Sequence, residues 1–91
     1  MHALVVTVTI QPGHGEEAQA QLDNVVVPMA KQSPGVVSGY WLAPVEGHGL
    51  SVVLFENEEK ARAAADRVPN APRPDFVTFD TIEVREVVAQ T

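Results

Sequence analysis

The sequence predicts an α+β fold whose elements follow the order strand, helix, strand, strand, helix, strand. Four apolar segments are rich in β-branched residues and end at turn-forming residues, as strands do. Two further segments carry apolar residues at steps of three and four, as amphipathic helices do. The positions of these six segments along the chain give the element order.

Size and composition indicate one globular domain, and we expect it to span residues 1–91. The chain is 45% hydrophobic and 20% charged, which is typical of globular proteins. Its net charge of −6 and scattered basic residues exclude nucleic acid and membranes as expected partners. It has no cysteine, and so neither disulfides nor thiolate chemistry. The first residues lack a signal-peptide pattern, so we expect a cytoplasmic protein.

The first predicted strand runs from Ala3 to Ile10 and ends at a proline–glycine turn. Helical spacing follows from Gly15 to Gln32, with acids in the first turn and Lys31 in the last. The positions predicted to share its apolar face are Ala18, Leu22, Val25 or Val26, and Met29. Pro28 lacks a backbone donor and clashes with the preceding turn, so we expect a kink or an early end there.

A hairpin is predicted in the middle of the chain. Its strands run from Val36 to Leu42 and from Leu50 to Phe55. The glycine-bearing segment from Pro44 to Gly49 connects them and contains His48.

The remaining segments are a second helix and a last strand. Asn57 is predicted to cap a helix from Glu58 to Val68, whose alanines form a narrow apolar face. The proline-rich segment Pro69 to Pro74 is predicted to be a loop. Phe76 to Val88 is either one long strand or two segments broken near Asp80.

Right-handed crossovers around a central hairpin arrange these elements as a ferredoxin-like β-α-β-β-α-β sandwich. Its four-stranded antiparallel sheet carries both helices on one face. Residues 3–10 and 50–55 are apolar on both faces, whereas an antiparallel sheet with one wet face alternates apolar and polar residues. We therefore expect a second copy of the chain to cover the open face in a two-fold homodimer.

Three stretches carry a resemblance to a known family: VVTVTIQPG, VVVPMAKQSPGVVSGYW and GLSVVLFENEEKARAAADRV. With the element order, they make the chain similar to the dimeric α+β-barrel superfamily, in particular its antibiotic-biosynthesis-monooxygenase-like branch. The resemblance covers nearly the whole chain. It implies a homodimer whose subunits bind ligands in a cleft between the sheet and the helices.

The resemblance also implies several activities. The residues of this chain fit some of these activities better than others. Haem-degrading members use an asparagine on the first strand, a tryptophan in the sheet and a histidine on the second helix. Here the first strand offers only Thr7 and Thr9 as polar side chains, and residues 58–68 contain no histidine, so haem degradation is disfavoured. Members that oxidise phenols without a cofactor suggest catalytic candidates, which are Asn24, Tyr40, Trp41 and Arg85.

Adjacent Tyr40 and Trp41 are expected on opposite faces of the sheet, one toward any cleft and one toward the partner subunit. Either they only contribute buried area, or one lines a pocket and binds a ligand through its polar tip. His48 is a further ligand-binding candidate, as a lid over the cleft. No metal site is expected, because His2, His14 and His48 lack ligand spacing.

Glu83 and Arg85 fall on one face of the last strand, where they form an ion pair or Arg85 holds an anionic substrate. Two functions remain open at this point. One is cofactor-free oxidation or rearrangement of a small aromatic or polyketide-like molecule. The other is a non-catalytic homodimer that binds a small molecule or serves in a stress response.

Overall fold

The computed structural model describes all of residues 1–91 and contains the predicted order of elements. Its strands are β1 (His2–Ile10), β2 (Val36–Val45), β3 (His48–Phe55) and β4 (Val77–Glu86). Its helices are α1 (Gly15–Gln21), the π-helical η1 (Leu22–Val26), α2 (Val27–Lys31), α3 (Glu58–Arg67) and the short 3₁₀ turn η2 (Val68–Asn70). No helix is long and apolar enough to cross a membrane.

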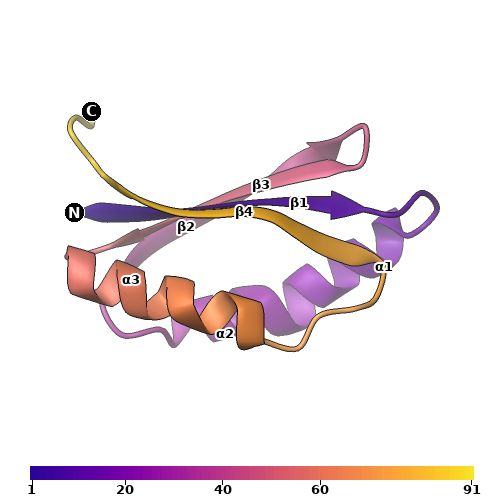
Figure 1. Ribbon diagram of the computed structural model, residues 1–91, viewed down its shortest axis with the longest axis horizontal. Helices are drawn as coiled ribbons and strands as arrows, with labels where there is room; N and C mark the ends of the chain where they lie inside the picture. The colour runs from indigo at the N-terminus through magenta and orange to yellow at the C-terminus, as the bar shows by residue number, and fades with distance from the viewer.

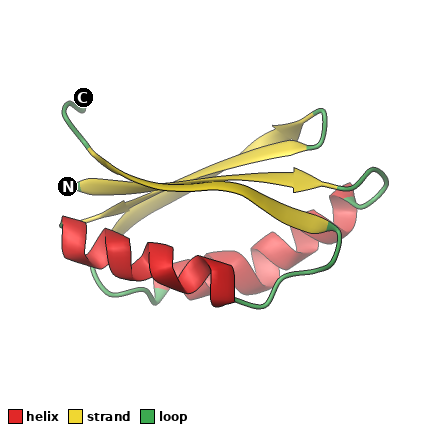
Figure 2. Ribbon diagram, in the orientation of Figure 1, coloured by secondary structure: helices red, strands yellow, loops and turns green.

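The sheet is antiparallel, with the strand order β2-β3-β1-β4. All helices lie on one face of it, and no element of this chain covers the other face (Figures 1 and 2). The predicted ferredoxin-like sandwich is therefore confirmed.

The core lies between the two central strands and α3. Asn57 caps α3, as predicted, because its side-chain oxygen accepts a hydrogen bond from the Lys60 amide at 2.9 Å. Alanine side chains let α3 lie close to the sheet, where they meet larger residues of β1 and β3. The buried cluster is Leu4, Val6, Val53, Phe55, Ala61 and Ala64.

The other helix packs less closely. The segments α1, η1 and α2 form one continuous helix, since the residues at their junctions keep helical backbone angles. None of its residues is buried, in contrast to the two buried alanines of α3. The two helices thus contribute unequally to the core.

A π-turn interrupts this long helix just before Pro28. In a regular α-helix the amide of residue 28 would bond to the Asn24 carbonyl, which Pro28 cannot do. Instead, the Val27 amide bonds to the Leu22 carbonyl, five residues back. Pro28 then lies in the first turn of α2, where a residue without an N–H is tolerated. The expected interruption is therefore a widened turn, and the helix continues to Lys31.

The widened turn changes which side chains face the sheet. At about 100° per residue, Met29 would lie within about 20° of Ala18, and Lys31 on nearly the opposite side. In the structure Met29 is 51% exposed and Ala30 lies inward in its place, while Lys31, also an exposed residue, lines the edge of a cavity under β2. The prediction for Met29 was wrong, since the π-turn shifts the phase of every later residue. Val27 and Ala30 occupy the inward positions instead.

The hairpin is tighter than predicted. Only Glu46 and Gly47 form its turn, with φ angles of 52° and 80°, the left-handed pair that matches the twist of the strands. Pro44 lies within β2, which tolerates proline because it is an edge strand. His48 is the first residue of β3 and not a loop residue.

The last strand is continuous and carries one β-bulge. Thr7 pairs with Thr81 and Val8 with Phe79, so Asp80 is the additional residue on β4. The single-strand alternative is thus the correct one, and Asp80 marks an irregularity in it.

The face of the sheet away from the helices is apolar over β2 and β3. Tyr40 pairs with Val52, and Leu42 pairs with Leu50. Tyr40 is 59% exposed and Leu42 is 52% exposed. This exposed surface, which we call the open face, accounts for the strands that are apolar on both sides.

The directions in which the side chains of α2 point can be tested with two polar substitutions that preserve side-chain shape. We expect Val27→Thr to lower the free energy of unfolding by about 1 kcal/mol, because it places a hydroxyl against the sheet. Met29→Gln should change it by less than about 0.5 kcal/mol, because the side chain is solvated. Urea denaturation of both variants measures the difference. A larger loss for Met29→Gln would contradict the π-turn.

Candidate functional site in the cleft between helix α2 and strand β2

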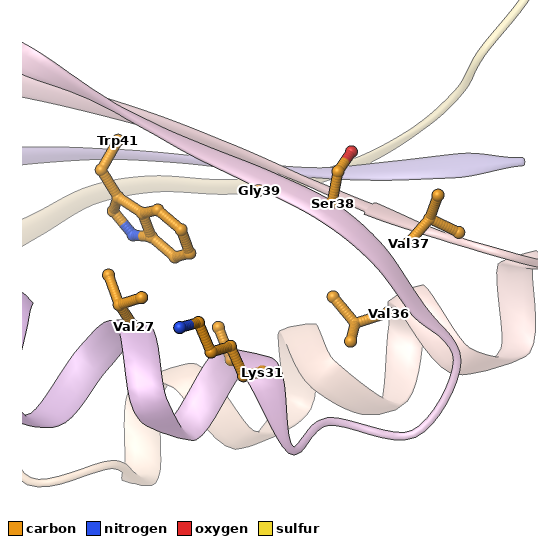
Figure 3. Close-up of a pocket in the computed structure, with 8 residues that line it drawn as sticks. Val27, Lys31, Val36, Val37, Ser38, Gly39 and Trp41 are labelled. Carbon is orange, nitrogen blue, oxygen red and sulfur yellow. The ribbon is translucent and has the colours of Figure 1, made fainter.

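A cavity of about 290 Å³ lies between α2 and the edge strand β2. Figure 3 shows the side chains of Trp41 and Val36 directed into it from the strand, and that of Val27 from the helix. The walls are mostly hydrophobic. The complete lining is Val27, Ala30, Lys31, Val36, Val37, Ser38, Gly39 and Trp41.

Trp41 is positioned by Gly39. A Cβ atom at residue 39 would lie 2.8 Å from Cη2 of the Trp41 ring and 2.9 Å from its Cζ3. Gly39 needs no unusual backbone angle, so its role is to leave room for the indole. The outer edge of the ring therefore rests against β2, and the ring forms one wall of the cleft.

Lys31 is the only charged residue that lines the cleft. Its ammonium group extends along the helix toward Val27 and Trp41 (Figure 3). No carboxylate pairs with it, and it takes part in no side-chain hydrogen bond. The ion pairs of the chain are His14–Glu17, Glu58–Arg62 and Glu83–Arg85.

The side chains that face the cleft offer hydrogen-bond donors and no acceptors. The Trp41 indole N–H and the Lys31 ammonium are donors only, and no protein group accepts from either. The Ser38 hydroxyl points away from the helix (Figure 3). The cleft is thus an apolar slot with two free donors.

The other candidates from the sequence lie elsewhere. Tyr40 projects from the open face, on the side of β2 opposite to Trp41. Arg85 forms the expected ion pair with Glu83, its Nε 3.1 Å from the Glu83 carboxylate. Asn24 is an exposed residue of η1, and His48 lies at the start of β3. Of the pair at 40 and 41, Trp41 faces the cleft.

A second polar cluster lies across the sheet at the β-bulge. The Thr9 hydroxyl donates to the Asp80 carboxylate at 2.6 Å, and its oxygen lies 3.3 Å from His48 Nδ1. Since Thr9 gives its single proton to Asp80, His48 can only donate to it. His48 therefore does not act as a base toward this hydroxyl, and the cluster serves as a cross-strand contact.

Glu58, the carboxyl group whose pKa is shifted, does not line the cleft either. A hydrogen bond from Arg62, and then its charge, hold the pKa of Glu58 below its ordinary value on the exposed side of α3. No three histidine or acidic side chains come together in a way that could hold a metal ion. The chemistry that the cleft can perform therefore depends on Trp41 and Lys31.

The sequence indicated Trp41 as a candidate but placed Lys31 only in the last turn of a helix. The sequence signal for its position in the cleft is Pro28, three residues earlier in a helical pattern. A π-turn before a proline moves the following residues around the helix axis, which regular periodicity does not anticipate.

Solved structures confirm the two-layer α+β sandwich, which is the fold of the antibiotic-biosynthesis-monooxygenase-like proteins. Residues 13–71 match the model of a family described as "protein of unknown function (DUF3240)". The chain belongs to this DUF3240 family. A comparison with curated protein sequences found no match.

Three solved structures illustrate the shared fold. The heme-degrader MhuD from Mycobacterium tuberculosis, with two hemes bound, aligns with a TM-score of 0.77 and 20% identity over 100% of this chain and 99% of that one. A proposed antibiotic biosynthesis monooxygenase from Deinococcus radiodurans aligns with a TM-score of 0.68 and 15% identity, over 100% of this chain and 96% of that one. The protein NE2512 from Nitrosomonas europaea, of unknown function, aligns with a TM-score of 0.66 and 23% identity, over 99% of this chain and 91% of that one.

The cleft does not fit a haem. Haem iron in proteins is held by histidine, cysteine, methionine or tyrosine, and none of these lines the cleft. Helix α3 contains no histidine either. The histidines lie on β1, before α1 and on β3. The haem chemistry of MhuD is therefore not carried over to this chain.

The close contact between Gly39 and Trp41 gives a direct test of the site. We expect Gly39→Ala to displace the indole, shift its fluorescence emission and lower the free energy of unfolding by about 1–3 kcal/mol. Trp41 is the only tryptophan, so emission reports this ring alone.

The matched control is Gly15→Ala, because an added Cβ there meets nothing within 4 Å. It should leave emission unchanged and stability within about 1 kcal/mol. Unchanged emission in Gly39→Ala would show that the ring does not rest on the strand.

Proposed function

We propose that this protein binds a small planar aromatic molecule in the cleft between α2 and β2. The observation that carries the proposal is an apolar cavity walled by an indole and supplied with two unpaired donors. Its volume of about 290 Å³ lies just below the roughly 300–1,000 Å³ typical of small-molecule sites. A ligand of one or two fused rings suits that space.

Binding is favoured over catalysis as the primary function. The cleft holds no nucleophile paired with a base and no carboxylate or imidazole that could move a proton. Lys31 is its single titratable side chain. An ammonium group orients and neutralises an acceptor, which is the work of a binding site.

Cofactor-free oxidation of a phenolic substrate is the second candidate. The location of Trp41 in the cleft favours it, as does the fold shared with the Deinococcus protein. In such a reaction an anthrone would consume one O₂, become a quinone and release one water. Lys31 could hold the substrate as its electron-rich phenolate.

We further propose that the protein works as a homodimer that covers the open face. Tyr40 and Leu42 are large, exposed and adjacent to a row of apolar residues on β3 and β1. A contiguous apolar surface of this kind is typical of an interface. A two-fold dimer covers the same surface on both subunits.

Binding in the cleft can be tested by filling it. Thermal unfolding is recorded with a panel of naphthalene-sized aromatic compounds, and any compound that binds only the folded protein should raise the midpoint. Ala30→Leu should abolish the rise because its side chain occupies the cleft. Ala63→Leu, on the exposed side of α3, should retain it. An equal response in Ala30→Leu would exclude this cleft as the site.

Oxygen uptake separates the two candidate functions. With an anthrone substrate, a binding protein should leave O₂ consumption at the rate of spontaneous oxidation, measured with an oxygen electrode. An oxygenase should accelerate it, and Trp41→Phe should remove most of the acceleration. Such acceleration would replace binding with catalysis as the primary function.

The dimer can be tested by light scattering at micromolar concentration. The native chain should give twice its own mass. Leu42→Lys should give a monomer, because it places a charge in the interface, whereas Met29→Lys, equally exposed but on the helix, should remain a dimer. A native monomer would refute the proposed interface.

A further inference from the structure

We infer that the cleft selects an aromatic anion, a carboxylate or phenolate of one or two rings, whose charge is held by Lys31. The inference rests on the proposed binding function and adds the charge of the ligand to it. Volume and apolar walls set the size and shape of the ligand. The polar groups set its charge.

The donors in the cleft determine which ligand is favourable. A hydrocarbon in the cleft would offer the Lys31 ammonium and the Trp41 indole N–H no acceptor in place of the water that it displaces. An anionic oxygen can accept from both. No acidic side chain lines the cleft to compete for Lys31 or to repel an anion.

The net negative charge of the protein repels an anionic ligand at a distance, but the direct contact of the ligand with Lys31 outweighs this repulsion. The chain has a net charge of −6, which repels anions at a distance. At physiological ionic strength that repulsion is screened beyond about 8 Å. Charge-assisted hydrogen bonds at contact are roughly twice as strong as neutral ones. The local pair with Lys31 therefore decides which ligand binds.

A role at the helix end alone does not account for the position of Lys31 beside the cleft. A lysine in the last turn of a helix stabilises the helix dipole. That role requires only a charge near the last carbonyls. Side chains of a helix lean toward its N-terminus, and from residue 31 this direction leads along the cleft toward Val27 and Trp41 (Figure 3). The π-turn places it there, on the side of the helix that faces β2.

The test compares 2-naphthoate with 2-naphthamide, its neutral counterpart of the same shape, by isothermal titration calorimetry. We expect the native protein to bind naphthoate roughly ten- to a hundredfold more tightly, the range of a charged hydrogen bond. Lys31→Met should remove this difference by weakening naphthoate alone. Lys31→Arg should keep part of it, because the charge remains.

Arg67→Met provides the matched control. Arg67 occupies the last turn of α3 and pairs with no carboxylate, so its loss also removes one charge from a helix end. It should leave both affinities unchanged. Circular dichroism should show the same helix content in all variants.

The possible results are distinguishable. Equal affinities for the two compounds in the native protein, or an unchanged preference in Lys31→Met, would overturn the anion selectivity and leave an aromatic site. Failure of both compounds to bind would overturn the proposed function together with the inference.

Discussion

The missing amide hydrogen of Pro28 is the constraint on which the candidate site depends. Because Pro28 cannot bond one turn back, the helix widens to a π-turn, and the Val27 amide bonds to the Leu22 carbonyl. The widened turn rotates all later residues about the helix axis. It moves Met29 into solvent and brings Lys31 under the edge strand. The turn before Pro28 thus directs Ala30, and not Met29, toward the sheet, with Lys31 beside it at the cleft.

The two helices have different roles: α3 contributes to the buried core, and the longer helix borders the cleft. Alanines let α3 lie close to β1 and β3, where the buried core forms. The longer helix has no buried residue and leaves a cavity beside β2. On the strand, Gly39 makes room for the Trp41 ring. The looser half of the sandwich is therefore the half with space for a ligand.

The fold could be predicted because the sequence signals for helices and strands lie in neighbouring residues. Asn57 caps a helix through its own side chain, and β-branched runs form strands in many contexts. The site was only partly predictable. Alternation placed Tyr40 and Trp41 on opposite faces but did not say which was which. The position of Lys31 depended on a π-turn, which a regular period of 3.6 residues conceals. The tight turn at Glu46 requires a left-handed backbone at a residue other than glycine, which composition does not reveal.

We propose that ligands bind in the cleft between α2 and β2. The most direct measurement is a two-dimensional ¹⁵N–¹H NMR spectrum of labelled protein titrated with 2-naphthoate. We predict that the shifted signals cluster in residues 27–31 and 36–41 and include the single indole N–H signal, that of Trp41. Shifts confined to the open face around Tyr40 and Leu42, with an unmoved indole signal, would contradict it.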